Sequence, residues 1–141
     1  MIDHIGVAVS DYAASKMFYT RTLSSIGYSL LMELPATVTG SVDVAGFGMA
    51  PKADFWIAAG TPNKPPIHIA FRVDNRALVD AFHAAGIAAG GRDNGAPGIR
   101  PQYHPHYAVS SSLRSIILTT TVRSSSTRTV TMSKRSITAR Q

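Results

Sequence analysis

The chain opens with alternating apolar and small or polar residues, a pattern that predicts a β-strand over residues 2–9. Ser10 and Asp11 supply helix N-cap chemistry, and the apolar residues after them recur at helical spacing, which predicts a helix over residues 12–26. Gly27 is a typical helix stop. Further apolar runs predict strands over residues 28–34, 42–49 and 53–59.

The same order of elements then begins again. A second alternating run covers residues 66–73, Asp74 and Asn75 are N-cap candidates for a helix over residues 76–89, and Gly90-Gly91 follows. A shift of 64 residues superposes five landmarks of the two halves: His4 on His68, Val9 on Val73, Phe18 on Phe82, Leu23 on Ile87 and Gly27 on Gly91. The shared register predicts an α+β fold of paired βαβββ modules.

Strand parity indicates what the two first strands do. The first strand places its β-branched residues on one face, and His4, Gly6 and Ala8 on the other. The equivalent strand places His68 and Arg72 opposite its bulky residues. We expect the bulky faces to pack against the helices, and the two histidines to face a shared cleft.

The length of 141 residues suits a single domain. We expect a first module over residues 1–62, a second over 63–107, and a distinct tail over 108–141. No apolar run reaches the roughly 18 residues that span a bilayer, and the first residues lack the basic region of a signal peptide. We therefore expect a cytoplasmic protein without a membrane partner. The chain has no cysteine, so any metal must bind to His, Asp or Glu.

The formal net charge of +6 comes entirely from the tail. All 8 acidic residues lie between Asp3 and Asp93, and the first 107 residues contain as many basic residues as acidic ones. The tail also lacks the aromatic residues that single-strand nucleic-acid binders use for stacking on bases. We therefore expect no nucleic-acid partner.

Three segments carry a family resemblance. Residues 3–11 read DHIGVAVSD, residues 66–71 read PIHIAF, and residues 90–105 form a loop that reads GGRDNGAPGIRPQYHP. Together they resemble the vicinal-oxygen-chelate superfamily, which contains glyoxalases, bleomycin-resistance proteins and dioxygenases. The resemblance covers residues 1–107 and implies two modules around one cleft, a small-molecule ligand and a homodimer.

The resemblance also implies a metal centre. In this family a divalent metal is typically held by a histidine from the first strand of each module and by one or two glutamates from the last strands. His4 and His68 match the histidines, and iron, manganese, nickel or zinc would suit such ligands. The glutamate positions depart from the pattern, because residues 53–57 offer only Asp54 and no acidic residue follows Asp93. The ligand set is incomplete in this sequence.

Four residues are candidates for contact with a substrate. Trp56 alternates with another aromatic residue along a strand, so that one of the two faces the cleft and can stack on a planar ligand, although core packing is the alternative. Arg72 shares a face with the second-module histidine and suits an anionic substrate, or lies in solvent at a strand end. His104 and Tyr107 belong to the YHPHY segment, which either contacts a substrate or simply leads into a strand.

Composition changes abruptly after Tyr107. Residues 108–141 contain no Gly, Pro, Asn, Asp or Glu, although the turns of a βββ unit need Gly, Asn, Asp or Pro. One interpretation is a basic extension in which the β-prone residues 116–122 and 127–132 replace the usual closing strands. The other is a shift of reading frame near Tyr107, which would give a Ser-, Thr- and Arg-rich translation. We favour the frame shift.

Two functions of different classes fit these observations. The first is a metal-dependent lyase, isomerase or dioxygenase acting on a small molecule with vicinal oxygens. The second is a metal-free binding protein, like the bleomycin-resistance branch, that holds a ligand without turnover. The missing carboxylate favours the second and the paired histidines favour the first. A third possibility is a damaged product that keeps the scaffold without activity.

Overall fold

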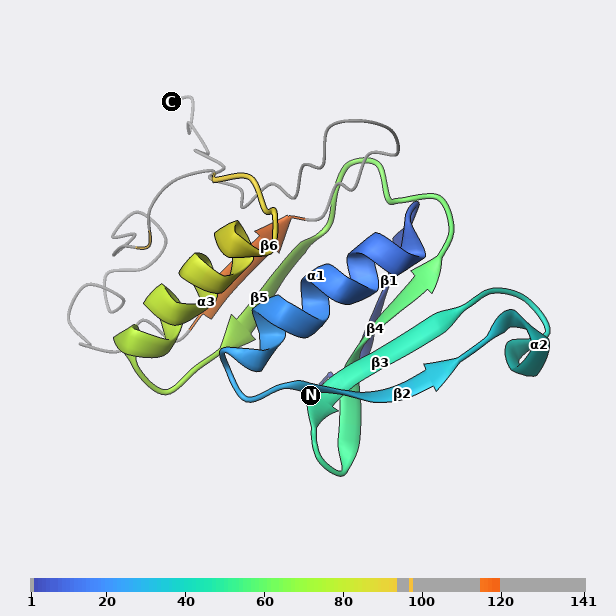
Figure 1. Cartoon of the computed structure of the whole chain (residues 1–141), viewed down its shortest axis with the longest axis horizontal. Coiled ribbons are helices and arrows are strands. Elements are labelled where there is room, and N and C mark those ends of the chain that lie inside the picture. The colour runs from blue at the N-terminus through green and yellow to red at the C-terminus, as the bar shows by residue number, and fades with distance from the viewer. Residues whose placement is uncertain (1, 94–96, 98–114, 120–141) are drawn as a thin grey trace, which may run out of the picture.

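A computed structural model describes residues 2–93, 97 and 115–119. Figure 1 shows two helices lying over a larger and a smaller sheet. In the described part of the chain, no helix is long and apolar enough to cross a membrane. The elements follow in this order: β1 (Ile5–Val9), α1 (Tyr12–Ser24), β2 (Ser29–Leu34), α2 (Ala36–Thr39), β3 (Val44–Met49), β4 (Lys52–Ala59), β5 (His68–Arg72), α3 (Arg76–Ala88) and β6 (Ser115–Thr119).

Both long helices begin at the predicted caps. The Asp11 side chain accepts a hydrogen bond from the backbone N–H of Ala14 at 2.9 Å. The Asn75 side chain accepts one from the backbone N–H of Leu78 at 3.0 Å. Each cap satisfies a donor that the first helical turn leaves without an intrahelical partner.

Both helices are followed by a glycine with positive φ, but the repeat shifts there by one residue. Gly27 has a φ of 85° and Gly90 a φ of 98°, whereas the 64-residue shift aligns Gly27 with Gly91. Gly91 serves a different purpose, because a Cβ on it would lie 2.6 Å from the carbonyl oxygen of Gly86. In the second module, Gly90 therefore adopts the left-handed conformation that ends the helix, and Gly91 makes the close approach to the helix.

The first module forms one four-stranded sheet in the order β1-β4-β3-β2. β1 pairs in parallel with β4, and β3 pairs antiparallel with both β4 and β2. This arrangement agrees with the predicted βαβββ module. The single-turn helix α2 has no counterpart in the prediction. Asp43 stabilises its start by accepting a hydrogen bond from the backbone N–H of Ala36 at 2.8 Å.

The first strand of the second module is paired differently. β5 pairs antiparallel with β6, with His68 opposite Thr119, whereas β1 pairs in parallel with the last strand of its own module. β6 overlaps the predicted strand over residues 116–122. The other predicted tail strand, over residues 127–132, lies outside the described residues.

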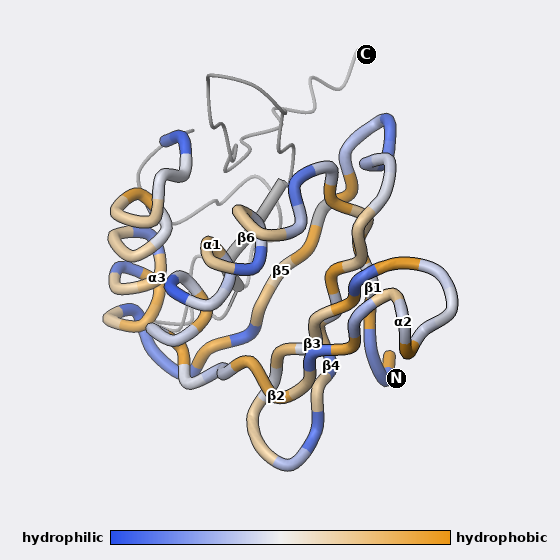
Figure 2. The backbone as a smooth tube through the Cα atoms, turned by 45° about the vertical axis from the view of Figure 1, so that its right-hand side comes forward, coloured by the Kyte–Doolittle hydropathy of each residue, from blue (hydrophilic) through white to orange (hydrophobic). Residues whose placement is uncertain are grey.

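The two modules share one hydrophobic core. α1 and α3 are in contact and lie side by side in Figures 1 and 2. Phe71 of β5 joins the modules, because its ring centroid lies 5.2 Å from that of Phe55 in β4 and 6.1 Å from that of Phe82 in α3. Aromatic pairs at such distances stabilise a core beyond their buried area.

The expected strand parity is confirmed on both first strands. In β1, Val7 and Val9 are buried while Gly6 is exposed. In β5, the bulky residues are likewise buried while Ala70 and Arg72 are exposed. Each first strand therefore packs its bulky side into the core and leaves its small or polar side uncovered.

Candidate functional site

One face of the four-stranded sheet carries small residues on its parallel strand pair, β1 and β4. Cross-strand register places Gly6 opposite Trp56, and Ala8 opposite Ala58. These four residues are exposed or half-buried, and we call them the open face. Phe55, the aromatic neighbour of Trp56, is only 1% exposed and packs in the core. Of the two aromatic residues on this strand, Trp56 is therefore the one available to a ligand.

Trp56 lies between two glycines on the neighbouring strands. It is in register with Gly6 of β1 and with Gly46 of β3. A Cβ on Gly46 would lie 2.8 Å from Cη2 and Cζ3 of the indole, so the benzo ring occupies the space above Gly46. A Cβ on Gly6 would meet no described atom within 4 Å. The indole therefore covers the β3 side of its strand and leaves the β1 side open.

From the sequence, Gly46 and Gly48 indicate a bulge or a close approach of the backbone. Both features occur. The register of β3 and β4 shifts between Phe47 and Gly48, and a Cβ on Gly48 would lie 2.1 Å from the carbonyl oxygen of Lys52. Sequence reasoning missed that Gly46 makes room for the Trp56 indole, because this depends on which residues pair across strands.

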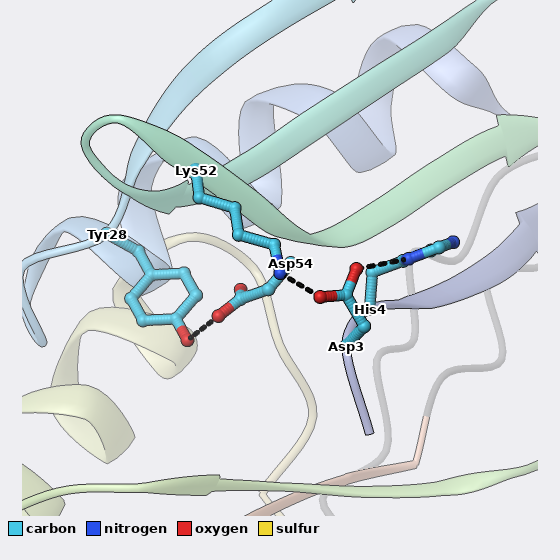
Figure 3. Close-up of polar contacts among 5 residues, drawn as sticks. All are labelled: Asp3, His4, Tyr28, Lys52 and Asp54. Carbon is cyan, nitrogen blue, oxygen red and sulfur yellow. Dashed lines mark hydrogen bonds and ion pairs between the residues drawn. The ribbon is translucent and has the colours of Figure 1, made fainter. Parts of the chain in front are cut away.

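Asp54 lies at this bulge, and its hydrogen-bond partner packs against the second module. Its carboxylate accepts a hydrogen bond from the Tyr28 hydroxyl at 3.0 Å (Figure 3). Burial of the hydroxyl and its bond to the carboxylate raise the pKa of Tyr28 to about 12. The Tyr28 ring packs edge-on against Phe71, with the centroids 5.6 Å apart. Sequence reasoning did not foresee this pair, since 26 residues separate its members.

His4 lies directly before β1, and its side chain contacts the carboxylate of the preceding residue, Asp3. Its Nδ1 is 3.1 Å from the Asp3 carboxylate, and Lys52 donates a hydrogen bond to the other oxygen of that carboxylate (Figure 3). The hydrogen bonds from Lys52 and His4 hold the pKa of Asp3 below its ordinary value. The His4 side chain is 63% exposed. The contact with Asp3 orients the imidazole through Nδ1 and does not involve Nε2.

A family model of the Glyoxalase/Bleomycin resistance protein/Dioxygenase superfamily matches residues 1–104. The chain belongs to this superfamily. A crystal structure of a glyoxalase/bleomycin resistance protein from Albidiferax ferrireducens T118 is similar to it, with a TM-score of 0.57 and 26% sequence identity. The similarity covers 83% of this chain and 86% of that one. No curated protein matches the chain.

Superfamily members often use divalent metals, but the described donors do not complete such a centre. Among the described residues, no three His, Asp or Glu side chains come together. Most acidic side chains are engaged at separate places instead. Their partners are His4 and Lys52 for Asp3, the Ala14 N–H for Asp11, Lys16 for Glu33, the Ala36 N–H for Asp43, Tyr28 for Asp54, Arg76 for Asp80 and His83 for Asp93.

The other predicted site residues are placed only in part. His68 is the first residue of β5, and its side chain lies outside what the structure describes. Arg72 is exposed at the end of β5, in a different sheet from Trp56. His104 and Tyr107 lie outside the described residues. Of the two predicted substrate contacts that the structure describes, Trp56 lies on the open face and Arg72 does not.

Proposed function

We propose that this protein binds a small molecule on the open face of the first-module sheet, in contact with Trp56, and that binding requires no metal. The observation that carries the proposal is the half-buried Trp56 indole, with Gly6, Ala8 and Ala58 as its small neighbours on β1 and β4. Small-molecule sites are mostly apolar and aromatic, with space beside the aromatic group. The engaged acidic side chains favour binding over metal-dependent turnover.

The physical basis is the apolar area that Trp56 leaves in water. Burial of such area contributes roughly 25 cal/mol per Å², and a tryptophan presents more of it than any other side chain. The small residues around the indole let a ligand contact both the ring and the backbone. Gly6, Ala8 and Ala58 carry no charge, so an uncharged part of the ligand suits this part of the face.

The test uses the fact that Trp56 is the only tryptophan of the chain. A library of small fragments is titrated into ¹⁵N-labelled protein, and the single indole N–H resonance is followed. We expect ligands that shift this resonance in the wild type and lose about tenfold or more of their affinity in Trp56→Leu. Val38→Ala is the control, because Val38 is an exposed apolar residue on α2. Ligands that bind Trp56→Leu as tightly as the wild type would refute a site on the open face.

A metal-dependent lyase, isomerase or dioxygenase is the second candidate. It is favoured by the orientation of His4, whose Nδ1 contacts a carboxylate as metal-bound histidines commonly do. In this candidate His4 and His68 bind the metal, while Arg72, His104 and Tyr107 contact the substrate.

Elemental analysis of purified wild type and His68→Ala separates the two candidates. A stoichiometric metal that is lost in the variant supports the enzyme. Wild-type protein without metal, and without a rise in melting temperature on addition of iron, manganese, nickel or zinc, contradicts it.

We also infer that the protein is a cytoplasmic homodimer. Members of the superfamily often form dimers, and closed two-fold pairs are the commonest oligomers of soluble proteins. Light scattering coupled to size-exclusion chromatography should give twice the chain mass of 15.0 kDa. Elution at the mass of one chain would contradict the dimer.

A further inference from the structure

All three methionines in the described part of the chain are exposed, and they lie on different elements. Met17 is on α1, Met32 is on the edge strand β2, and Met49 is the last residue of β3. They are 51%, 46% and 56% exposed. Exposure leaves a thioether open to oxidation, and the sulfoxide that forms is polar where the thioether is apolar. The surroundings of each methionine decide what such a change would affect.

Met32 lies in one row with Trp56 across the first-module sheet. The register pairs Met32 of β2 with Gly46 of β3, and Gly46 with Trp56 of β4. Residues that pair across neighbouring strands point to the same face of a sheet, so Met32 is on the face of Trp56. The next residue, Glu33, agrees with this assignment, because its carboxylate binds Lys16 of α1 on the face that the helices cover (Figure 1).

The lack of a side chain on Gly46 brings the indole toward Met32. The benzo ring of Trp56 lies above Gly46, with Cη2 and Cζ3 at 2.8 Å from a Cβ built there. Residues paired across strands have their Cβ atoms about 4.5–5.5 Å apart, so the Cβ of Met32 lies about that far from the same point. The thioether extends beyond this Cβ and is therefore within reach of the ring. Sulfur and aromatic rings attract each other at about 5 Å.

Met17 and Met49 have other surroundings. Met17 is on α1, which lies over the opposite face of the sheet (Figure 1). The methyl group of Met49 lies 3.5 Å from a Cβ built on Gly27, the glycine that follows α1. These two methionines match Met32 in exposure but not in position, so they serve as controls.

We propose that Met32 is a redox-sensitive modification site, and that its oxidation by a hydroperoxide changes the surroundings of Trp56. The sulfur takes the terminal oxygen of the hydroperoxide as the O–O bond breaks, and the proton of that oxygen passes to the leaving oxygen. The sulfur loses two electrons, and the hydroperoxide gains them and leaves as an alcohol, or as water if hydrogen peroxide is the oxidant. The sulfoxide oxygen then holds water beside the indole, because burying it without a hydrogen bond is costly.

The consequence for binding rests on the proposed function. An apolar ligand that covers the Trp56 indole would displace water from the neighbouring sulfoxide, whereas the thioether of Met32 loses little when it is covered. Oxidation of Met32 should therefore weaken binding by about threefold or more.

The experiment treats the full chain with hydrogen peroxide and follows the indole N–H resonance of Trp56 without any ligand. Peptide mass spectrometry measures the sulfoxide at each methionine and verifies that Trp56 is unmodified. Oxidation should shift the resonance in the wild type, in Met17→Leu and in Met49→Leu, and should leave it in place in Met32→Leu. Leucine keeps an apolar side chain of similar volume at each position. A methionine sulfoxide reductase supplied with a dithiol should return the wild-type resonance to its original place.

A wild-type resonance that stays in place although Met32 is oxidised overturns the proposal. An equal shift in oxidised Met32→Leu also overturns it, because the signal then comes from another methionine. The same holds if Met32 stays reduced while Met17 and Met49 are oxidised. If the resonance shifts but the fragment ligands bind oxidised and untreated protein equally, the effect on binding is refuted. If no fragment binds the untreated protein, the proposed function fails, and the resonance alone decides whether Met32 is a redox-sensitive site.

Discussion

At the scale of single residues, the contact of Trp56 with Gly46 makes a prediction for stability. Gly46→Ala should lower the free energy of unfolding by about 1–3 kcal/mol, because the new methyl group overlaps the indole. Gly6→Ala should change it by no more than about 0.5 kcal/mol, because its methyl group enters open space. Urea unfolding of the two variants measures the difference. Equal effects would mean that the indole does not rest above Gly46.

The Tyr28–Asp54 hydrogen bond predicts a dependence of stability on alkaline pH. The pKa of Tyr28 is raised from 10.0 to about 12, so the folded chain holds this proton more tightly than the unfolded chain. The resulting stability is fully present below pH 10 and is lost as the pH rises toward 12.

The prediction is tested by the urea concentration at the midpoint of unfolding, measured at an alkaline pH below 10 and again between pH 10 and 12. The wild type should lose more stability between the two conditions than Tyr28→Phe, which has no hydroxyl proton to release. Tyr12→Phe is a useful comparison, since burial also raises the pKa of Tyr12. If wild type and Tyr28→Phe lose stability in parallel, the hydroxyl of Tyr28 is not held as described.

At the scale of residues, the sequence identifies which side chains are candidates for function, but it does not identify their hydrogen-bond partners. Trp56 was a candidate because of its chemistry and its alternation with Phe55, and the structure confirms that one of the two faces outward. The engagement of Asp54 by Tyr28 was not predictable, because a bulge redirects the carboxylate. This difference bears directly on function, since Asp54 was the carboxylate nearest to the family pattern.

At the scale of elements, the caps of the two long helices yield a prediction. Asp11→Ala should lower the free energy of unfolding by about 1 kcal/mol, because the backbone N–H of Ala14 loses its acceptor. Asp11→Asn keeps a side-chain oxygen and should stay close to the wild type. Asn75→Ala should behave like Asp11→Ala. Urea unfolding measures all three variants, and an Asp11→Asn variant as unstable as Asp11→Ala would contradict a capping role.

Most elements of residues 2–93 could be predicted, because their strands alternate and their helices have polar caps and glycine stops. Boundaries moved by a few residues: β1 begins at Ile5 and α1 ends at Ser24, whereas the patterns predict residues 2–9 and 12–26. The antiparallel pairing of β5 with β6 was not predictable. Strand direction follows from the chain path between the strands, and residues 92–114 of this path carry no regular hydrophobic pattern.

At the scale of the whole molecule, the family match and the change in composition end at nearly the same place. The match covers residues 1–104, and the residues after Tyr107 contain no Gly, Pro, Asn or Asp, the residues that the turns of a closing βββ unit need. We expect the neighbouring reading frame beyond this point to encode an Asp-Pro-Xaa-Gly turn followed by a strand with a glutamate. Resequencing and translation of the gene checks this, and a neighbouring frame without that pattern would favour a genuine basic extension.

The central claim is that the first-module sheet binds a small molecule through Trp56 without a metal. The most direct measurement is a titration of the strongest fragment ligand into protein pretreated with excess EDTA, and into protein supplied with iron, manganese, nickel or zinc, with the Trp56 indole resonance as the readout. The account predicts the same dissociation constant in all conditions. Binding that disappears with EDTA and returns with one of the metals would contradict it.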